Sequence, residues 1–260
     1  MKEKKEIIST VEEKELNAPN GLAVGILSVL VYIAAAVGVI PAAMALDNGS
    51  TAFGAPLMVM CVLWLCVGWI PFMGVKVIRP NEALVLTLFG KYTGTLKKEG
   101  IFFVNPFSIA VNPASAQKIA SGKNPQEATA PVGKKLSLKA MTLDNKKQKI
   151  NDRDGNPIEI SIVVIWKIAN TAKAVFNVDN YEEYVSIQSD SALRDVAGAY
   201  PYDGDGENVK SLRGSSAEIA GHLRDMLQSR VDDAGIEVIE ARITHLAYAP
   251  EIAAAMLQRQ

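Results

Sequence analysis

The chain has 260 residues, with 27 lysine and arginine side chains against 28 aspartate and glutamate side chains and a formal net charge of −1. This balance excludes the concentrated positive charge on which nucleic-acid-binding proteins depend, so no nucleic-acid partner is expected. The two cysteines, Cys61 and Cys66, lie in one apolar run, which excludes a disulfide framework and offers no zinc site. We interpret both as small apolar residues of a membrane helix, with reversible acylation near a membrane face as the alternative.

Residues 1–20 form a charged tail in which lysines alternate with glutamates. Alternation of this kind is typical of a solvated, weakly helical segment, and we expect a cytoplasmic tail. A cleaved secretory signal is the alternative, because Ala43-Met44-Ala45 resembles a small-residue cleavage site. Both the polar start and the apolar run after it are long for a signal peptide, which favours a retained tail.

Residues 21–73 are predicted to form a membrane hairpin. The only charged side chain among them is Asp47, in a short polar break between two apolar runs at about 22–46 and 53–72. Each run is long enough to cross a bilayer as a helix, and a charge at the middle of such a helix costs about 2.5 to 3.5 kcal/mol on the insertion scale. Pro41 should kink the first helix or end its regular part, so a re-entrant loop stays open beside full crossing.

The distribution of lysine and arginine predicts how the hairpin is oriented. Four lysines lie in the tail, none lie in the turn at 47–52, and several basic residues follow the second run. The positive-inside rule therefore places both termini and the globular part in the cytoplasm, with a multi-pass anchor in the plasma or inner membrane. Aromatic and basic residues at the far end of the second run should lie at the membrane interface. The residues that we expect there are Trp64, Trp69, Phe72, Lys76 and Arg79.

After the hairpin, apolar residues recur with the periods of strands and amphipathic helices. Residues 112–135 have no apolar period and contain three prolines, which predicts a surface loop. Near the end, Ile239, Ala241 and Ile243 alternate as one face of a strand, and Pro250 is a good first residue for a last helix. The other predicted strands include 75–78, 83–89, 101–104 and 158–168, and the other predicted helices are at about 180–200 and 215–234.

No constellation of catalytic or metal-binding residues follows from the motifs. Segments beginning at Asp152 and Asp203 resemble the start of a calcium loop, but both lack the glycine at position six and the glutamate at position twelve. His222 and His245 lack the spacing of a zinc motif, and no glycine-rich loop continues as a phosphate-binding loop. We therefore predict a protein that is not an enzyme and that has no catalytic residue, cofactor or metal site.

Several short motifs of the globular part occur in a defined order. They are Arg79-Pro80-Asn81-Glu82, Gly100-Ile101-Phe102-Phe103-Val104-Asn105-Pro106-Phe107, Asp154-Gly155-Asn156-Pro157, Ser191-Ala192-Leu193-Arg194-Asp195-Val196 and Gly235-Ile236-Glu237-Val238. Together they resemble the stomatin/prohibitin/flotillin domain, also called the SPFH or band 7 domain, and are similar to bacterial slipin-like members. The resemblance covers about residues 74–260 except the loop, and it depends on the order of the pieces, because each alone is a turn or a short strand.

This resemblance implies an α+β fold, in which a curved β-sheet with packed helices follows the N-terminal two-helix transmembrane hairpin. The domain would extend over residues 74–248, with subdomains at about 74–168 and 169–248 and the loop as an insertion at 112–135. Residues 249–260 would begin a C-terminal helix that continues as a coiled coil in the family and is truncated here. Its apolar side is either domain core or a subunit contact, and we favour the contact. The candidates for it are Ile252, Met256 and Leu257.

Members of this family are generally non-enzymatic proteins that oligomerise on membranes. The resemblance therefore implies a membrane-anchored scaffold that organises membrane microdomains and integral membrane proteins, with the lipid bilayer and further copies of itself as partners. An integral membrane protease, a channel or a protein of the NfeD type is a further expected partner, which would connect the scaffold to protein quality control. The alternative is a dedicated regulatory subunit of one membrane protease, channel or transporter, and a membrane-bound hydrolase is a third hypothesis.

Overall fold

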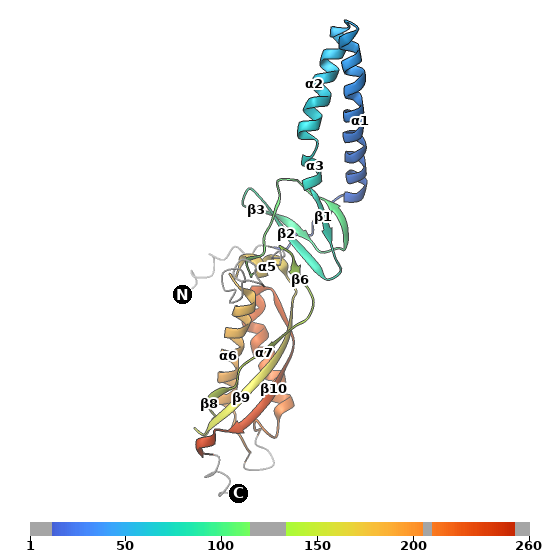
Figure 1. Cartoon of the computed structure of the whole chain (residues 1–260). Helices are drawn as coiled ribbons and strands as arrows, with labels where there is room; N and C mark the ends of the chain where they lie inside the picture. Colours follow the sequence, from blue (N-terminus) through green and yellow to red (C-terminus); the bar gives the residue numbers. More distant parts are fainter. Residues whose placement is uncertain (1–11, 115–133, 205–209, 253–260) are drawn as a thin grey trace, which may run out of the picture. The chain divides into compact units, whose positions relative to one another are not determined.

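The computed structural model describes residues 12–114, 134–204 and 210–252 (Figure 1). The chain divides into two compact units by its internal contacts. One unit extends from Lys14 to Val111 and contains the hairpin and the first strands. The other combines residues 1–13 with residues 112–260. Each unit is described by itself below.

The membrane hairpin consists of two antiparallel helices and a short third one. Helix α1 (Gly21–Asp47) begins where the Asn20 side chain accepts a hydrogen bond from the Leu22 N–H at 3.0 Å. The helix has 27 residues and continues through Pro41, so of the two predicted effects of Pro41, a kink or an end of the regular helix, the second does not occur. Helices α2 (Thr51–Val67) and α3 (Ile70–Met73) follow the turn (Figure 1).

The second predicted span is interrupted near its end. A Cβ atom at Gly68 would lie 2.6 Å from the Trp64 carbonyl oxygen, and the chain leaves α2 at this glycine before α3 begins. Closer to the turn, small residues let the two long helices approach. A Cβ at Gly38 would lie 3.0 Å from the Cys61 Sγ, and one at Gly54 would lie 2.9 Å from the side chain of Leu46. These contacts hold α1 and α2 together inside the hairpin.

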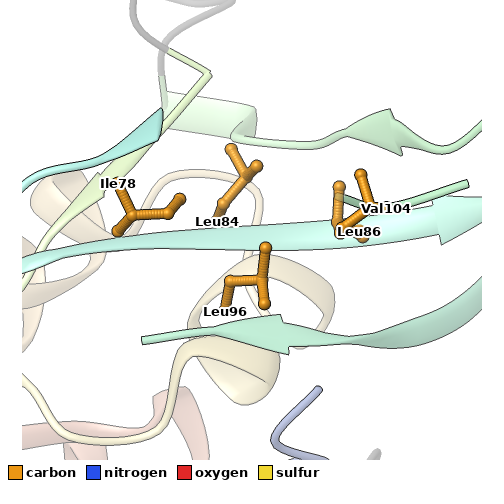
Figure 2. Close-up of a cluster of buried hydrophobic side chains, with 5 residues drawn as sticks. All are labelled: Ile78, Leu84, Leu86, Leu96 and Val104. Atoms are coloured by element: carbon orange, nitrogen blue, oxygen red, sulfur yellow. The ribbon is translucent and has the colours of Figure 1, made fainter. Parts of the chain in front are cut away.

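Two small antiparallel sheets complete the first unit. Strands β1 (Val75–Ile78) and β4 (Gly100–Phe103) form a ribbon, and β2 (Glu82–Leu88), β3 (Lys91–Leu96) and β5 (Ile109–Ala110) pair in the order β3-β2-β5. Alternate residues of a strand face the same side, so two leucines of β2 enter one core together. Figure 2 shows this core, which consists of Ile78, Leu84, Leu86, Leu96 and Val104.

The described part of the N-terminal tail, residues 12–20, is extended and docked and not weakly helical as the charge pattern predicted, although most of its residues are exposed. The Leu16 N–H donates to the Thr95 carbonyl at 3.0 Å, and the Phe103 N–H donates to the Pro19 carbonyl at 3.0 Å. Leu16 and Ala18 also pack against the core of Figure 2. The prediction failed because unpaired backbone groups at the edge of β3 attract an extended segment whatever its charge.

The second unit is a twisted sheet covered on one face by helices. The sheet consists of β7 (Met141–Asp144), β8 (Gln148–Asn151), β9 (Pro157–Ile168) and β10 (Ile236–Tyr248). The short strand β6 (Leu136–Ser137) precedes this sheet in the chain and is not part of it. Strands β7, β8 and β10 all pair with β9 in antiparallel fashion. Helices α6 (Tyr181–Ala199) and α7 (Ser216–Val231) lie side by side over this sheet, and α5 (Thr171–Phe176) and a 3-10 turn (Asp232–Ala234) connect the elements (Figure 1).

The division of the chain into units differs from the predicted subdomains. The contacts divide the chain after Val111, whereas the resemblance suggested a boundary near residue 168. Strand β9 ends at that residue, but it pairs along its whole length with β10, from Ile236 opposite Ile168 to Tyr248 opposite Ile158. A boundary there would separate two strands of one sheet, so the strand pairing explains the difference.

One predicted face of β10 is also different. The register shifts between Val238 and Glu240, so Ile239 lies at a β-bulge. Val238 and Ala241 are buried, whereas Ile239 is 42% exposed and does not share a face with Ala241. A bulge adds one residue to the strand and changes the alternation, which a pattern of apolar residues alone does not reveal.

Tyr181 gives the second unit a defined pH dependence. The residue is buried at the start of α6, with its ring centroid 6.1 Å from that of Trp166. Burial raises the pKa of Tyr181 to about 12. The charge of Glu182 adds a smaller increase, and a side-chain hydrogen bond with Asn112 acts in the opposite direction. Between pH 10 and pH 12 the unfolded chain loses this proton while the folded chain keeps it.

The free energy of unfolding should therefore be intact below pH 10 and decrease by up to about 1.4 kcal/mol per pH unit as the pH rises towards 12. Urea unfolding of the wild type and of a Tyr181→Phe variant, measured from pH 9 to 11.5, checks this prediction. The difference between the two curves isolates Tyr181 from the other groups that titrate in this range. Parallel curves would show that the hydroxyl ionises equally in the folded and unfolded chains.

Candidate membrane interface

The predicted interface residues lie between the last turns of α2 and the turn that follows β1. Trp64 is on α2, Trp69 precedes α3, Phe72 is on α3, and all three are exposed. Lys76 is half-buried on β1, two residues after α3 ends at Gly74, which places it within about 7 Å of the helix end.

Arg79 lies farther from the helix end than Lys76. It follows the last residue of β1, which corresponds to about 16 Å along an extended chain from Gly74. Its backbone N–H donates to the Glu82 carboxylate at 3.3 Å, so Arg79 is part of the turn between β1 and β2. Trp69, Phe72 and Lys76 thus lie near the junction of α3 and β1, Trp64 lies farther back on α2, and Arg79 lies at the opposite end of the ribbon.

The sequence interpretation missed an exposed apolar group at the end of the β3-β2-β5 sheet. Phe89 is 88% exposed at the tip of the β2–β3 hairpin, and Phe107 and Ile109 are also exposed. Ile109 pairs with Thr87 in an antiparallel register, so Phe107 extends along the sheet towards Phe89. We call these three residues, Phe89, Phe107 and Ile109, the aromatic edge.

Phe89 also has an unfavourable backbone conformation. Its φ angle is +49° and that of Gly90 is +83°, which together make a two-residue hairpin turn between Leu88 and Lys91. Asparagine, aspartate or glycine normally occupies such a position, because a bulky side chain is strained there. A strained and exposed phenylalanine favours a functional contact over a folding role. The Leu88-Phe89-Gly90-Lys91 turn is the sequence signal by which it could have been found.

The aromatic edge lies at the same end of the first unit as the foot of the hairpin. Strand β4 runs antiparallel to β1, with Phe103 opposite Val75, and the Val104 N–H donates to the Gly74 carbonyl at 2.9 Å. The segment that carries Phe107 therefore starts beside the residue that ends α3, and three residues reach at most about 11 Å. Apolar aromatic residues at this level suit the boundary between lipid tails and headgroups.

Substitution of Phe89 separates a membrane contact from a role in folding. Asparagine tolerates a positive φ angle, so Phe89→Asn should leave the thermal midpoint unchanged or slightly higher. The membrane contact is measured in nanodiscs that contain nitroxide lipids, with a fluorescent dye attached to Lys91→Cys. Phe89→Asn should lower the quenching of this dye by the nitroxide at least twofold. A dye on the exposed Lys139→Cys of the second unit controls for nonspecific quenching. Equal quenching with and without Phe89 would show that the aromatic edge stays in water.

Comparison with known proteins identifies the family. Residues 76–260 match the family profile described as SPFH domain / Band 7 family. The chain belongs to this family. The resemblance seen in the motifs is confirmed, and with it a domain of mixed helix and sheet that follows two apolar helices long enough to cross a membrane.

Curated relatives of this SPFH chain are distant. Mouse stomatin is 20% identical over 195 residues, which cover 75% of this chain and 56% of stomatin. An uncharacterised protein of Methanothermobacter thermautotrophicus is 23% identical over 200 residues, which cover 77% of this chain and 53% of that protein. The chain therefore spans about half the length of the curated relatives it matches. The likeness to stomatin and the two apolar helices indicate that this SPFH protein associates with membranes.

The predicted C-terminal contact lies only partly within the described residues. Residues 250–252 are helical, as the proline at the start of this segment predicted. Ile252 is half-buried, and its N–H donates to the Ala249 carbonyl at 3.0 Å. Met256 and Leu257 lie outside the described residues. The subunit contact through these residues therefore stays a prediction.

The polar clusters of the SPFH unit have structural partners. The Asp152 carboxylate is buried and accepts hydrogen bonds from the backbone N–H groups of Asp154, Asn156 and Tyr202 at 2.7 to 3.1 Å, which confirms a turn at this position. The His222 ring lies 3.3 Å from the Tyr200 hydroxyl. Within the described ranges, no group of three or more His, Cys, Asp or Glu side chains is placed to hold a metal ion.

Proposed function

We propose that this SPFH protein is a membrane-anchored scaffold that oligomerises and organises membrane microdomains and integral membrane proteins. One observation carries the proposal: the hairpin passes into β1 at Gly74 without a linker, and the aromatic edge lies at the same level. A domain attached in this way is held against the bilayer surface and acts by contact with lipids and neighbouring proteins. Binding and lateral organisation need no catalytic constellation, which agrees with family members being generally non-enzymatic.

Two features support a complete crossing with both hairpin ends on one side of the membrane. The 27 residues of α1 are about 40 Å long, whereas the hydrocarbon core is about 30 Å thick. A re-entrant loop would not need a helix of this length. The tail segment before α1 pairs with β3 and β4, so it lies on the same side as the strands. The excess of lysine and arginine on this side favours the cytoplasm.

Labelling with a membrane-impermeant maleimide tests this orientation. We expect Lys98→Cys, in the exposed bend after β3, to react only in inverted vesicles, and Ser50→Cys, in the exposed turn between α1 and α2, to react only in right-side-out vesicles. The native Cys61 and Cys66 lie within α2 and serve as internal controls, because neither should react while the membrane is intact. Reaction of both introduced cysteines from the same side would establish a re-entrant hairpin.

The scaffold itself is tested by the mass of particles extracted with their surrounding lipid. An oligomer should give a particle far above the 28.0 kDa of one chain. The proteins that co-purify with it from intact membranes should then include several integral membrane proteins, each in a substoichiometric amount relative to this chain. A single partner in a one-to-one ratio, such as a protease, channel or NfeD-type protein, would favour the regulatory-subunit alternative. A monodisperse monomer would contradict both.

A further inference from the structure

The first unit has an apolar groove of about 420 Å³ at the foot of α1. One wall consists of three turns of α1, between Gly21 and Leu30, and the other consists of Phe72, Val75 and Ile101 from α3, β1 and β4. All of the residues that line the groove are apolar or glycine. A groove of this composition offers no polar group to orient a water-soluble ligand, so its occupant must be hydrocarbon.

Two glycines one turn apart create this space. A Cβ atom at Gly21 would lie 2.6 Å from the Phe102 carbonyl carbon, so the first turn of α1 rests directly on the backbone of β4. At Gly25, by contrast, a Cβ atom would have no neighbour within 4 Å. The helix is therefore held close to the ribbon at Gly21 and leaves an open channel at Gly25. Neither glycine lies in the contact with α2 that Gly38 and Gly54 make.

The dimensions of the groove select its occupant. The groove follows α1 from Gly21 to Leu30, a path of about 14 Å, which is about half of the 30 Å hydrocarbon core and thus the depth of one leaflet. Spread over this length, the volume corresponds to a cross-section on the order of 30 Å², whereas a helix about 10 Å wide needs on the order of 80 Å². One extended hydrocarbon chain fits within this cross-section, whereas a helix of a second copy would rest on the rim of the groove without filling it.

We propose that this groove holds one acyl chain of a phospholipid from the leaflet next to the SPFH domain. The proposal rests on the proposed function, because a lipid reaches the groove only if the hairpin spans the membrane. A chain in the groove touches α1, α3 and both strands of the ribbon, whereas lipids elsewhere on the hairpin touch helices alone. The bound lipid thereby contacts the domain as well as its anchor, and its chain contributes to how the domain is held at the membrane.

Photocrosslinking of the full chain in nanodiscs tests the proposal. The probe is phosphatidylcholine with a diazirine halfway along one acyl chain, and labelled residues are identified by mass spectrometry of peptides. We expect strong labelling of Ile26, Val29 and Phe72. Gly25→Leu should reduce it at least fivefold, because the new side chain fills the open channel without a clash. Ala36→Leu, on an exposed part of α1 outside the groove, is the matched control and should leave the labelling unchanged.

The outcomes separate this inference from the proposed function. Unchanged groove labelling in Gly25→Leu, or labelling of the groove no stronger than that of the residues around Ala36, would overturn the acyl-chain site while leaving the membrane anchor intact. Absence of labelling on all of α1 would contradict the anchor itself. Crosslinks between two protein chains, obtained with a photoreactive amino acid in place of Ile26, would assign the groove to a second copy and also overturn the proposal. Flotation of each variant with liposomes confirms that it still inserts.

Discussion

Replacement of Gly235 by alanine is expected to lower the free energy of unfolding by about 2 to 4 kcal/mol. This residue connects the 3-10 turn to β10 with a φ angle of +66°, in the left-handed region. A Cβ atom there would lie 2.4 Å from the Asn170 carbonyl oxygen and 2.8 Å from the Lys173 Cβ. The Gly235 carbonyl also accepts hydrogen bonds from the N–H groups of Ala169 and Asn170, so the backbone cannot move away without losing them.

Gly155 is the matched control for this change. Its φ angle is +85°, but a Cβ atom there would have no neighbour within 4 Å. Gly155→Ala should therefore lower the free energy of unfolding by only about 1 kcal/mol, because the alanine must adopt the left-handed conformation but meets no neighbour. Urea unfolding followed by the fluorescence of the buried Trp166 measures both variants in detergent. Equal losses of stability would show that the close approach of Gly235 to Asn170 contributes nothing.

The second large effect concerns the hairpin. Ile33→Arg, on the exposed surface of α1, should make insertion of this helix less favourable by about 3 kcal/mol, because a charged side chain replaces an apolar one in the lipid. We expect a smaller fraction of the full chain to resist extraction from membranes with alkaline carbonate. A translocon insertion assay of the α1 segment then measures the change in insertion free energy directly.

Ile187 provides a control with nearly the same exposure. It is 57% exposed on α6, compared with 54% for Ile33, but it belongs to the domain and not to the hairpin. Ile187→Arg should leave both membrane integration and the free energy of unfolding unchanged within about 0.5 kcal/mol. An equal loss of integration for both variants would mean that Ile33 is not surrounded by lipid. The same conclusion would follow if the insertion free energy of the Ile33→Arg segment equalled that of the wild-type segment.

Interpretation of the sequence was most accurate where a strong local pattern decides the structure. The helices over the hairpin and over residues 181–199 and 216–231 occur where apolar runs and helical spacing predicted them, as do strands β1 and β9. The family was also recognisable, because its short motifs keep their order along the chain. In these cases each segment needs only its own residues to specify its periodicity, so no knowledge of distant contacts was required.

The candidate interface was only partly predictable. Trp64, Trp69 and Phe72 lie toward the far end of the second apolar run, and this position predicts an interface role, whereas the aromatic edge brings together two turns about 18 residues apart. Their proximity follows from the pairing of β2 with β5, which is only two residues long. Such a short strand has no pattern of its own, so its partner could not be inferred from the sequence.

The two long apolar helices and the class of fold were thus readable from the order of residues alone. Four features needed the folded chain: the docking of Leu16 on β3, the exposure of Ile239, the boundary after Val111 and the groove beside Gly25. Each depends on which strand edge or helix face a segment meets far along the chain. The spacing of apolar residues along a segment shows which residues share a face. It does not show which other segment of the chain covers that face.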